Sequence, residues 1–312
     1  MSSLREMVPK SLRRAYRNLK LLLTADFEFT LRRLDYDEKD LRSLAGFVLR
    51  NAHPSLCAPA DGKAPINAHE GKVYSQYDED GILIHIFSAI GATDRRFVEF
   101  GVSDGRENQS DLFALIFGWS GLVIEADQRT YERARSFYNA MLPGPAAKRV
   151  NLIREMVTPE NINSILKLNS MTGGIDLLSI DIDSNDYWVW KAIDVIQPRV
   201  VVIEYNGALG NTEPVTIPYT PNFDRFKMHQ AGYYYGTSLK AAVKLGEAKG
   251  YTFVGCESSG GVNAFFVGKD VAAGKFSAVS PDDAFYPQMR RFKTQTVEEQ
   301  FAQIKHLPLE RV

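Results

Sequence analysis

Five short apolar runs alternate with segments of helical periodicity between residues 78 and 205, and this alternation constrains the fold more than any other feature. The last two runs are almost entirely β-branched residues and leucine, which is typical of parallel strands buried on both faces. The alternation therefore predicts a parallel sheet covered by helices on both faces. The predicted strands are Arg96–Val102, Leu122–Ala126, Val150–Val157, Ile175–Ile182 and Val200–Tyr205, and the predicted helices are Asp78–Ile90, Ser110–Phe117, Thr130–Tyr138, Pro159–Leu168 and Tyr187–Ile196.

The end of the predicted sheet departs from this alternation. A helix predicted over Ser238–Lys249 is followed by strands at Tyr251–Cys256 and Asn263–Val267, which the short link Ser258–Gly261 joins as a hairpin. The last strand must then run antiparallel to its neighbour. Five β/α units closed by a helix and a hairpin predict an α/β fold with a mostly parallel seven-stranded sheet, the Rossmann-like layout of class I methyltransferases. A nicotinamide-binding domain would more naturally end on a sixth parallel strand.

Composition limits the function classes. A formal net charge of −1 over 312 residues does not fit a nucleic-acid binder that works by bulk electrostatics. The two cysteines, Cys57 and Cys256, exclude a disulfide framework and a thiolate zinc cluster. No apolar stretch is long enough to span a bilayer and no signal peptide is recognisable, so a cytoplasmic location is expected. The expected domains are a helical extension with a linker (1–73), the catalytic domain (74–270) and a tail (271–312) that becomes helical from Val297.

The N-terminal segment is basic. Residues 1–35 hold eight Lys or Arg against four Asp or Glu, with leucines at helical spacing. One interpretation is an interfacial helix attracted to an anionic membrane surface. The interpretation that we favour is a helical extension that packs on the domain or on a second subunit, the latter giving a homo-oligomer.

The turn after the first predicted strand has the residue types of a nucleoside-binding turn. Glycines let the backbone approach a ligand closely, and a carboxylate at the tip of the next strand accepts hydrogen bonds from two ribose hydroxyls. The spacing E-x-G-x-x-x-G differs from the G-x-G-x-x-G of dinucleotide sites and favours S-adenosylmethionine, which has no pyrophosphate for a helix N-terminus to hold. The predicted donor-binding residues of this region are Glu99, Gly101, Ser103, Gly105, Glu125 and Ala126.

Acidic residues gather at the tips of the fourth and fifth predicted strands, with Asp181 and Asp183 after the fourth and Glu204 and Asn206 at the fifth. Carboxylates this close repel one another unless their charge is neutralised, and Mg²⁺ or Mn²⁺ suits such oxygen ligands. Catechol-type O-methyltransferases are similar here, since they use an Asp at the fourth tip and an acid with Asn at the fifth. These four residues are therefore candidate metal ligands, and Asp181 is also a candidate donor contact.

A second interpretation of the fourth tip is structural. Asp183, Ser184 and Asp186 have the residue types that cap the helix beginning near Tyr187. Capping does not explain the acid and the amide at the fifth tip, so the metal interpretation stays open beside it.

The candidate catalytic residues are Asp181, Asp183 and His229. A bound metal would orient the substrate hydroxyl and lower its pKa. Without a metal, a carboxylate or His229 would act as general base. His229 lies in the irregular stretch Gly207–Thr237, whose length and aromatic content favour a substrate lid over ordinary loop packing, although a lone histidine is more often structural.

Five motifs follow one another along the chain: Tyr74–Leu83, Phe97–Gly105, Gly118–Glu125, Ser179–Trp188 and Gly236–Lys240. Together they resemble the FkbM-type methyltransferases over roughly residues 72–270. The resemblance implies the class I methyltransferase fold, S-adenosylmethionine as donor, and O-methylation of a sugar or polyketide hydroxyl. It maps the glycine turn to Glu99, Gly101 and Gly105 and the ribose carboxylate to Glu125, and it places Tyr74, Ser75 and Gln76 beside the cofactor. The commoner family form I-D-x-E-G is replaced by Ile180–Ser184.

The sequence thus predicts an S-adenosylmethionine-dependent O-methyltransferase that acts on a small-molecule or glycan acceptor, with Mg²⁺ or Mn²⁺ as a candidate second cofactor. One alternative is a nicotinamide-dependent oxidoreductase on a Rossmann-like fold. The other is a non-catalytic scaffold tethered by the basic N-terminal helix.

Overall fold

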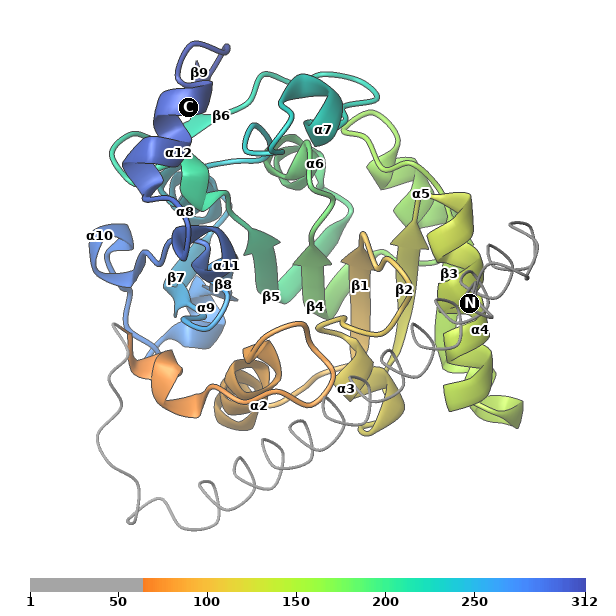
Figure 1. The fold of residues 1–312 in the computed structure, drawn as a ribbon. Helices are drawn as coiled ribbons and strands as arrows, with labels where there is room; N and C mark the ends of the chain where they lie inside the picture. Colours follow the sequence, from red (N-terminus) through yellow and green to blue (C-terminus); the bar gives the residue numbers. More distant parts are fainter. Residues whose placement is uncertain (1–63) are drawn as a thin grey trace, which may run out of the picture. The chain divides into compact units, whose positions relative to one another are not determined.

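A seven-stranded sheet forms the centre of the protein in the computed structural model, which describes residues 64–312 (Figure 1). Its strand order is β3-β2-β1-β4-β5-β8-β7, with β1 to β5 parallel and β8 antiparallel to both of its neighbours. This is the Rossmann-like methyltransferase fold, so the predicted fold class is confirmed. The strands are β1 Arg96–Phe100, β2 Ser120–Glu125, β3 Val150–Arg154, β4 Gly173–Ile180, β5 Ile196–Glu204, β7 Tyr251–Cys256 and β8 Asn263–Gly268.

Helices cover both faces of the sheet because alternate strand residues are apolar on each side. One face packs against α5, α6 and α8 through a core that includes Leu166, Trp190 and Leu245. The other face packs against α2, α3 and α4 through a core that includes Leu83 and Phe113. The helices are α2 Glu79–Ile90, α3 Asp111–Leu115, α4 Gln128–Met141, α5 Ile162–Leu168, α6 Asp186–Ala192 and α8 Leu239–Ala248, with 3-10 helices η2 Pro65–His69 and η3 Gly144–Arg149.

Five predicted strands extend beyond the observed ones at their carboxyl ends, β2 and β5 by one residue and the other three by two or three. Of these three, β1 ends at Phe100, β3 at Arg154 and β4 at Ile180. In β1 and β4 the reason is the turn that follows, since Gly101 adopts a φ of +77° and Asp183 a φ of +54°, which no strand accommodates. The apolar residues after these strands line the site instead of continuing the sheet.

The stretch Gly207–Thr237 is not structureless. It contains η4 Gly207–Leu209, β6 Val215–Thr216 and α7 Arg225–Met228, and it is fastened to the loop after β4. There the Asn185 side chain donates a hydrogen bond to the Thr220 carbonyl oxygen over 3.0 Å. The segment therefore has a fixed position over the β4 and β5 tips.

The C-terminal residues pack against the same end of the sheet. β9 pairs antiparallel with β6, and the Tyr205 hydroxyl donates a hydrogen bond to the Tyr286 carbonyl over 2.7 Å. The expected helical extension lies largely outside the described residues. No helix within residues 64–312 has the length and apolarity to cross a membrane. The remaining elements are α9 Lys269–Ala272, α10 Pro281–Ala284, α11 Met289–Phe292, α12 Val297–Ile304 and β9 Glu310–Arg311.

Candidate functional site

A cavity of about 590 Å³ lies at the carboxyl ends of the parallel strands, which is where ligands bind in open α/β sheets. One end lies at the β1 and β2 tips and includes Gly101, Glu125 and Ala126. The other end lies at the β4 and β5 tips and includes Asp181 and Glu204. A smaller cavity of about 140 Å³ shares part of its wall, around the turn after β1. The cavity volume is in the range of small-molecule sites.

Glu125, the last residue of β2, lines the large cavity with both carboxylate oxygens fixed by the backbone. Oε2 accepts a hydrogen bond from the Ser103 N–H over 2.7 Å, and Oε1 accepts one from the Asp127 N–H over 2.9 Å. The residue is 8% exposed. Because each carboxylate oxygen accepts more than one hydrogen bond, Glu125 keeps lone pairs available to a ligand.

The turns after β1 and β4 meet at Gly101. Its N–H donates a hydrogen bond to the Ile124 carbonyl over 2.9 Å, and its φ is +77°. A Cβ at this position would lie 1.6 Å from the carbonyl oxygen of Asp181. Only glycine fits this approach, which brings the Asp181 backbone against the predicted donor turn.

Glu99 holds the structure of the turn. Its buried carboxylate accepts hydrogen bonds from the N–H groups of Gln109 and Ser110, over 3.0 and 2.9 Å, and from the Ser179 hydroxyl over 3.1 Å. Burial raises its pKa, whereas these hydrogen bonds oppose that shift. Glu99 lines only the smaller cavity. Its main interactions therefore tie the segment before α3 to the sheet.

The other predicted donor-binding residues divide between the cavity wall and the protein interior. Ser103 and Gln76 line both cavities. Gly105 is buried beneath α4, where a Cβ would lie 3.1 Å from the Ala134 Cα. Ser75 is buried, and its N–H donates to the carboxylate of Asp80 over 2.8 Å.

The Asp80 carboxylate also binds Tyr74. It accepts the Tyr74 N–H over 2.6 Å, and neither Tyr74 nor Ser75 lines the two cavities described above. Gln76 is therefore the residue of the Tyr74–Gln76 segment that the structure brings to the site.

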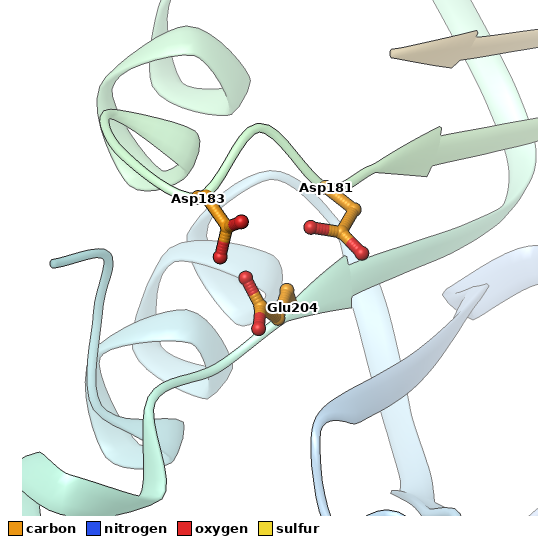
Figure 2. Close-up of side chains that lie close together, drawn as sticks. All are labelled: Asp181, Asp183 and Glu204. Atoms are coloured by element: carbon orange, nitrogen blue, oxygen red, sulfur yellow. The ribbon is translucent and has the colours of Figure 1, made fainter. Parts of the chain in front are cut away.

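Asp181, Asp183 and Glu204 converge at the far end of the cavity, two from the loop after β4 and one from the tip of β5 (Figure 2). One oxygen from each lies within 4.8 Å of the others. Burial and the nearby Asp186 raise the pKa of Asp181 to about 7. Burial and Asp181 raise the pKa of Glu204 well above its usual value. The group thus concentrates negative charge that favours a proton or a cation.

The loop that carries Asp181 and Asp183 is folded around Asp186, the first residue of α6. The buried Asp186 carboxylate accepts hydrogen bonds from the N–H groups of Ile182 and Ser184, over 2.8 and 3.0 Å. Burial raises its pKa to about 6. The structural interpretation of this tip therefore applies to Asp186, while Asp181 and Asp183 remain on the cavity wall.

The structure does not bring Asn206 to the acidic group. Its buried side chain donates to the carbonyls of Tyr233 and Tyr235, over 2.7 and 2.9 Å, and accepts the Ala208 N–H over 3.0 Å. The predicted fourth metal ligand therefore fastens the segment after β5 and does not line the cavity.

His229 also lies away from the cavity wall. It follows α7, its Nδ1 accepts the Tyr233 N–H over 3.4 Å, and the two rings stack with centroids 5.5 Å apart. These contacts give it a role in the turn, and they do not place it where a general base would act.

Residues from distant parts of the chain complete the acidic end. Arg225 forms an ion pair with Asp183, and its guanidinium lies 4.2 Å from the ring centroid of Tyr235. The Tyr235 hydroxyl donates a hydrogen bond to Glu204 Oε1 over 2.9 Å. Arg290, from α11, lines the same wall. Arg225 and Tyr235 lie in the stretch predicted as a lid, but the sequence did not indicate that they meet the acidic group, and nothing in it signalled Arg290. Their proximity depends on how the segments after β5 and β8 fold back over the sheet.

No protein-family description matches the sequence, and no curated protein matches it significantly. Among solved structures, the N-terminal domain of EvdMO1 with S-adenosylhomocysteine bound is 16% identical, over 62% of this chain and 82% of that chain, with a TM-score of 0.40. The methyltransferase domain of bacterial CtHen1 is 16% identical over 61% and 97%, with a TM-score of 0.39. An O-methyltransferase family protein from Burkholderia thailandensis is 12% identical over 59% and 55%, with a TM-score of 0.36.

Proposed function

We propose that this protein is an S-adenosylmethionine-dependent methyltransferase that methylates a hydroxyl group of a carbohydrate or glycan precursor. The observation that carries the proposal is Glu125. It is a buried carboxylate at the β2 tip, held by two backbone N–H groups, in the wall of a cavity that continues to an acidic cluster. A carboxylate in this position suits the two ribose hydroxyls of a nucleoside.

The turn after β1 favours a sulfonium donor over a dinucleotide. A pyrophosphate is held by the N-terminus of a helix that follows the glycine turn directly. Here α3 begins at Asp111, six residues beyond Gly105, and the intervening segment is tied to Glu99. The geometry therefore offers a nucleoside site without a pyrophosphate site. The resemblance to the FkbM-type subfamily is part of the proposal.

The acidic end suits activation of an acceptor hydroxyl. The hydroxyl oxygen attacks the sulfonium methyl carbon, the carbon–sulfur bond breaks with its electrons passing to sulfur, and the hydroxyl proton passes to a carboxylate. Asp181 is our candidate for accepting that proton, since its backbone touches the proposed donor turn and its side chain lines the cavity. Positioning of this kind can lower a barrier by about 7–11 kcal/mol.

The residues at this end also fit a divalent cation. Glu204 Oε2 is buried and has no hydrogen-bond partner among the described residues, and three carboxylate oxygens lie within reach of one ion. Asp181, Asp183 and Glu204 would hold Mg²⁺ or Mn²⁺. Such an ion would orient the hydroxyl and lower its pKa.

Calorimetric titration with S-adenosylhomocysteine and with NAD⁺ tests the donor. We expect micromolar or tighter binding of S-adenosylhomocysteine and none of NAD⁺. The reverse preference would establish the oxidoreductase alternative. Asp181→Asn should abolish methyl transfer to a sugar acceptor while retaining S-adenosylhomocysteine binding. A scaffold would keep its cellular role in that variant. Mn²⁺ binding, followed by electron paramagnetic resonance with Glu204→Gln as control, tests the metal independently of activity.

A further inference from the structure

We propose that the acceptor carries an anionic group, a carboxylate or a phosphate, and that Arg290 binds it at the rim of the cavity. This inference rests on the proposed function, because it describes the acceptor of the same site. It names a substrate class, an acidic or phosphorylated sugar, and a residue that selects it.

The two basic side chains in the wall of the large cavity are Arg225 and Arg290. Arg225 is already committed, with an ion pair to Asp183 and its guanidinium against Tyr235. The Arg290 side chain has no ion pair or hydrogen bond with any residue in 64–312, although it lines the cavity. An unpaired guanidinium offers its N–H donors to a ligand in the cavity, and a carboxylate or phosphate group can accept two of these hydrogen bonds at once.

The backbone that carries Arg290 is seated firmly. The Met289 N–H donates a hydrogen bond to the Gly260 carbonyl over 2.8 Å. At Gly261 a Cβ would lie 2.1 Å from the Pro287 carbonyl oxygen, so the backbones of these two segments are in direct contact. The rim position of α11 is thus fixed before any ligand arrives, which lowers the entropy lost when the arginine binds.

Arg291, the next residue of α11, is held by its own contacts and leaves Arg290 to face the cavity. The Cζ atom of Arg291 lies 5.4 Å from the ring centroids of both Tyr233 and Tyr235, and its buried Nη1 has no hydrogen-bond partner among the described residues. Arg291 and Arg225 share the Tyr235 ring. Neither of these two guanidiniums is as open to a ligand as that of Arg290.

Two carboxylates of the acidic cluster have compensating groups beside them. Asp183 is neutralised by Arg225, and Glu204 lies beside Tyr235 and within the field of Arg291. The carboxylates would face the reacting hydroxyl, while Arg290 would face the opposite end of the acceptor. The arrangement suits one molecule with a neutral hydroxyl and an anionic group.

The test uses the full chain saturated with S-adenosylhomocysteine, titrated calorimetrically with D-glucose, D-glucuronate and D-glucose 6-phosphate at constant ionic strength. We expect at least one acidic sugar to bind about 10- to 100-fold more tightly than glucose, the gain of one charged hydrogen-bonded pair. A preference for glucuronate identifies a carboxylate acceptor, and a preference for the phosphate a phosphorylated one. Arg290→Gln should remove the preference. The control is Lys227→Gln, which removes an exposed cation of α7 that is paired with Asp224, and it should retain the preference.

Three results would overturn the inference. The first is binding of all three sugars with equal affinity, and the second is binding of none of them. The third is an unchanged preference in Arg290→Gln. In each case intact binding of S-adenosylhomocysteine leaves the proposed function standing, whereas loss of that binding in the unmodified protein refutes the proposed function itself.

Discussion

Replacing Gly101 by alanine tests the close approach on which the site depends. The added Cβ would lie 1.6 Å from the Asp181 carbonyl oxygen, and the backbone has a φ of +77°. The left-handed conformation costs a non-glycine residue about 1–2 kcal/mol. Forcing a methyl group into packed surroundings costs about 1–3 kcal/mol more. We therefore expect the free energy of unfolding to fall by about 2–5 kcal/mol, measured by urea denaturation followed by circular dichroism.

The matched control is Gly91→Ala. Gly91 follows α2 with a φ of +69° and a ψ of 169°, a conformation essentially restricted to glycine, and a Cβ there would meet no atom within 4 Å. This variant should lose only the conformational part, about 1–3 kcal/mol. Gly101→Ala should also weaken S-adenosylhomocysteine binding, because the Asp181 backbone must move away from the donor turn, while Gly91→Ala should not. Equal losses of stability in the two variants, with equal ligand affinity, would refute the close approach.

Glu125→Ala should weaken S-adenosylhomocysteine binding, measured by calorimetry, by roughly 3–6 kcal/mol, because two hydrogen bonds to a charged group are lost. The control is Glu132→Ala on the surface of α4, which should leave the affinity unchanged. Asn206→Ala should lower the free energy of unfolding by roughly 2–4 kcal/mol, because three hydrogen bonds to the backbone are lost. If the variant folds but binds Mn²⁺ more weakly, the purely structural role of Asn206 is contradicted. Burial and the neighbouring Glu257 raise the pKa of Glu79 from 4.5 to about 8, so the folded chain holds a proton that the unfolded chain releases. The free energy of unfolding should therefore fall as the pH rises between these values, and urea titrations of Glu79→Gln should show a shallower dependence.

The strand pattern predicted the sheet because its information is local. β4 and β5 each contain a run of leucine or β-branched residues that is buried on both faces, and the link at Ser258–Gly261 leaves a hairpin as the simple connection. The same locality explains Glu125, since the tip of the second strand follows from where its apolar run ends. Strand ends were predicted less well, because turn conformations such as the positive φ of Gly101 depend on contacts with another strand.

The acidic end of the cavity was predicted only in part, because its contacts are not local in the sequence. Asp181, Asp183 and Glu204 were predicted because they lie at the ends of strands. Their contacts with Arg225 and Tyr235 were not predicted, because these two residues reach the cluster from a segment whose fold is set by hydrogen bonds such as those of Asn206. A single sequence reports residue types at strand tips, but not which loop will cover them.

This difference between the two ends has a consequence for how the site works. The donor end is built from neighbouring turns, with Glu125 fixed by N–H groups that lie within a few residues of the strand tips. The other end of the cavity is assembled from the loop after β4, β5, α7 and α11, and α11 is held by contacts of the tail with Gly260 and Gly261. In the proposed function this is the end that meets the acceptor. A change at Arg290 would then alter acceptor selection while Glu125 keeps its backbone hydrogen bonds.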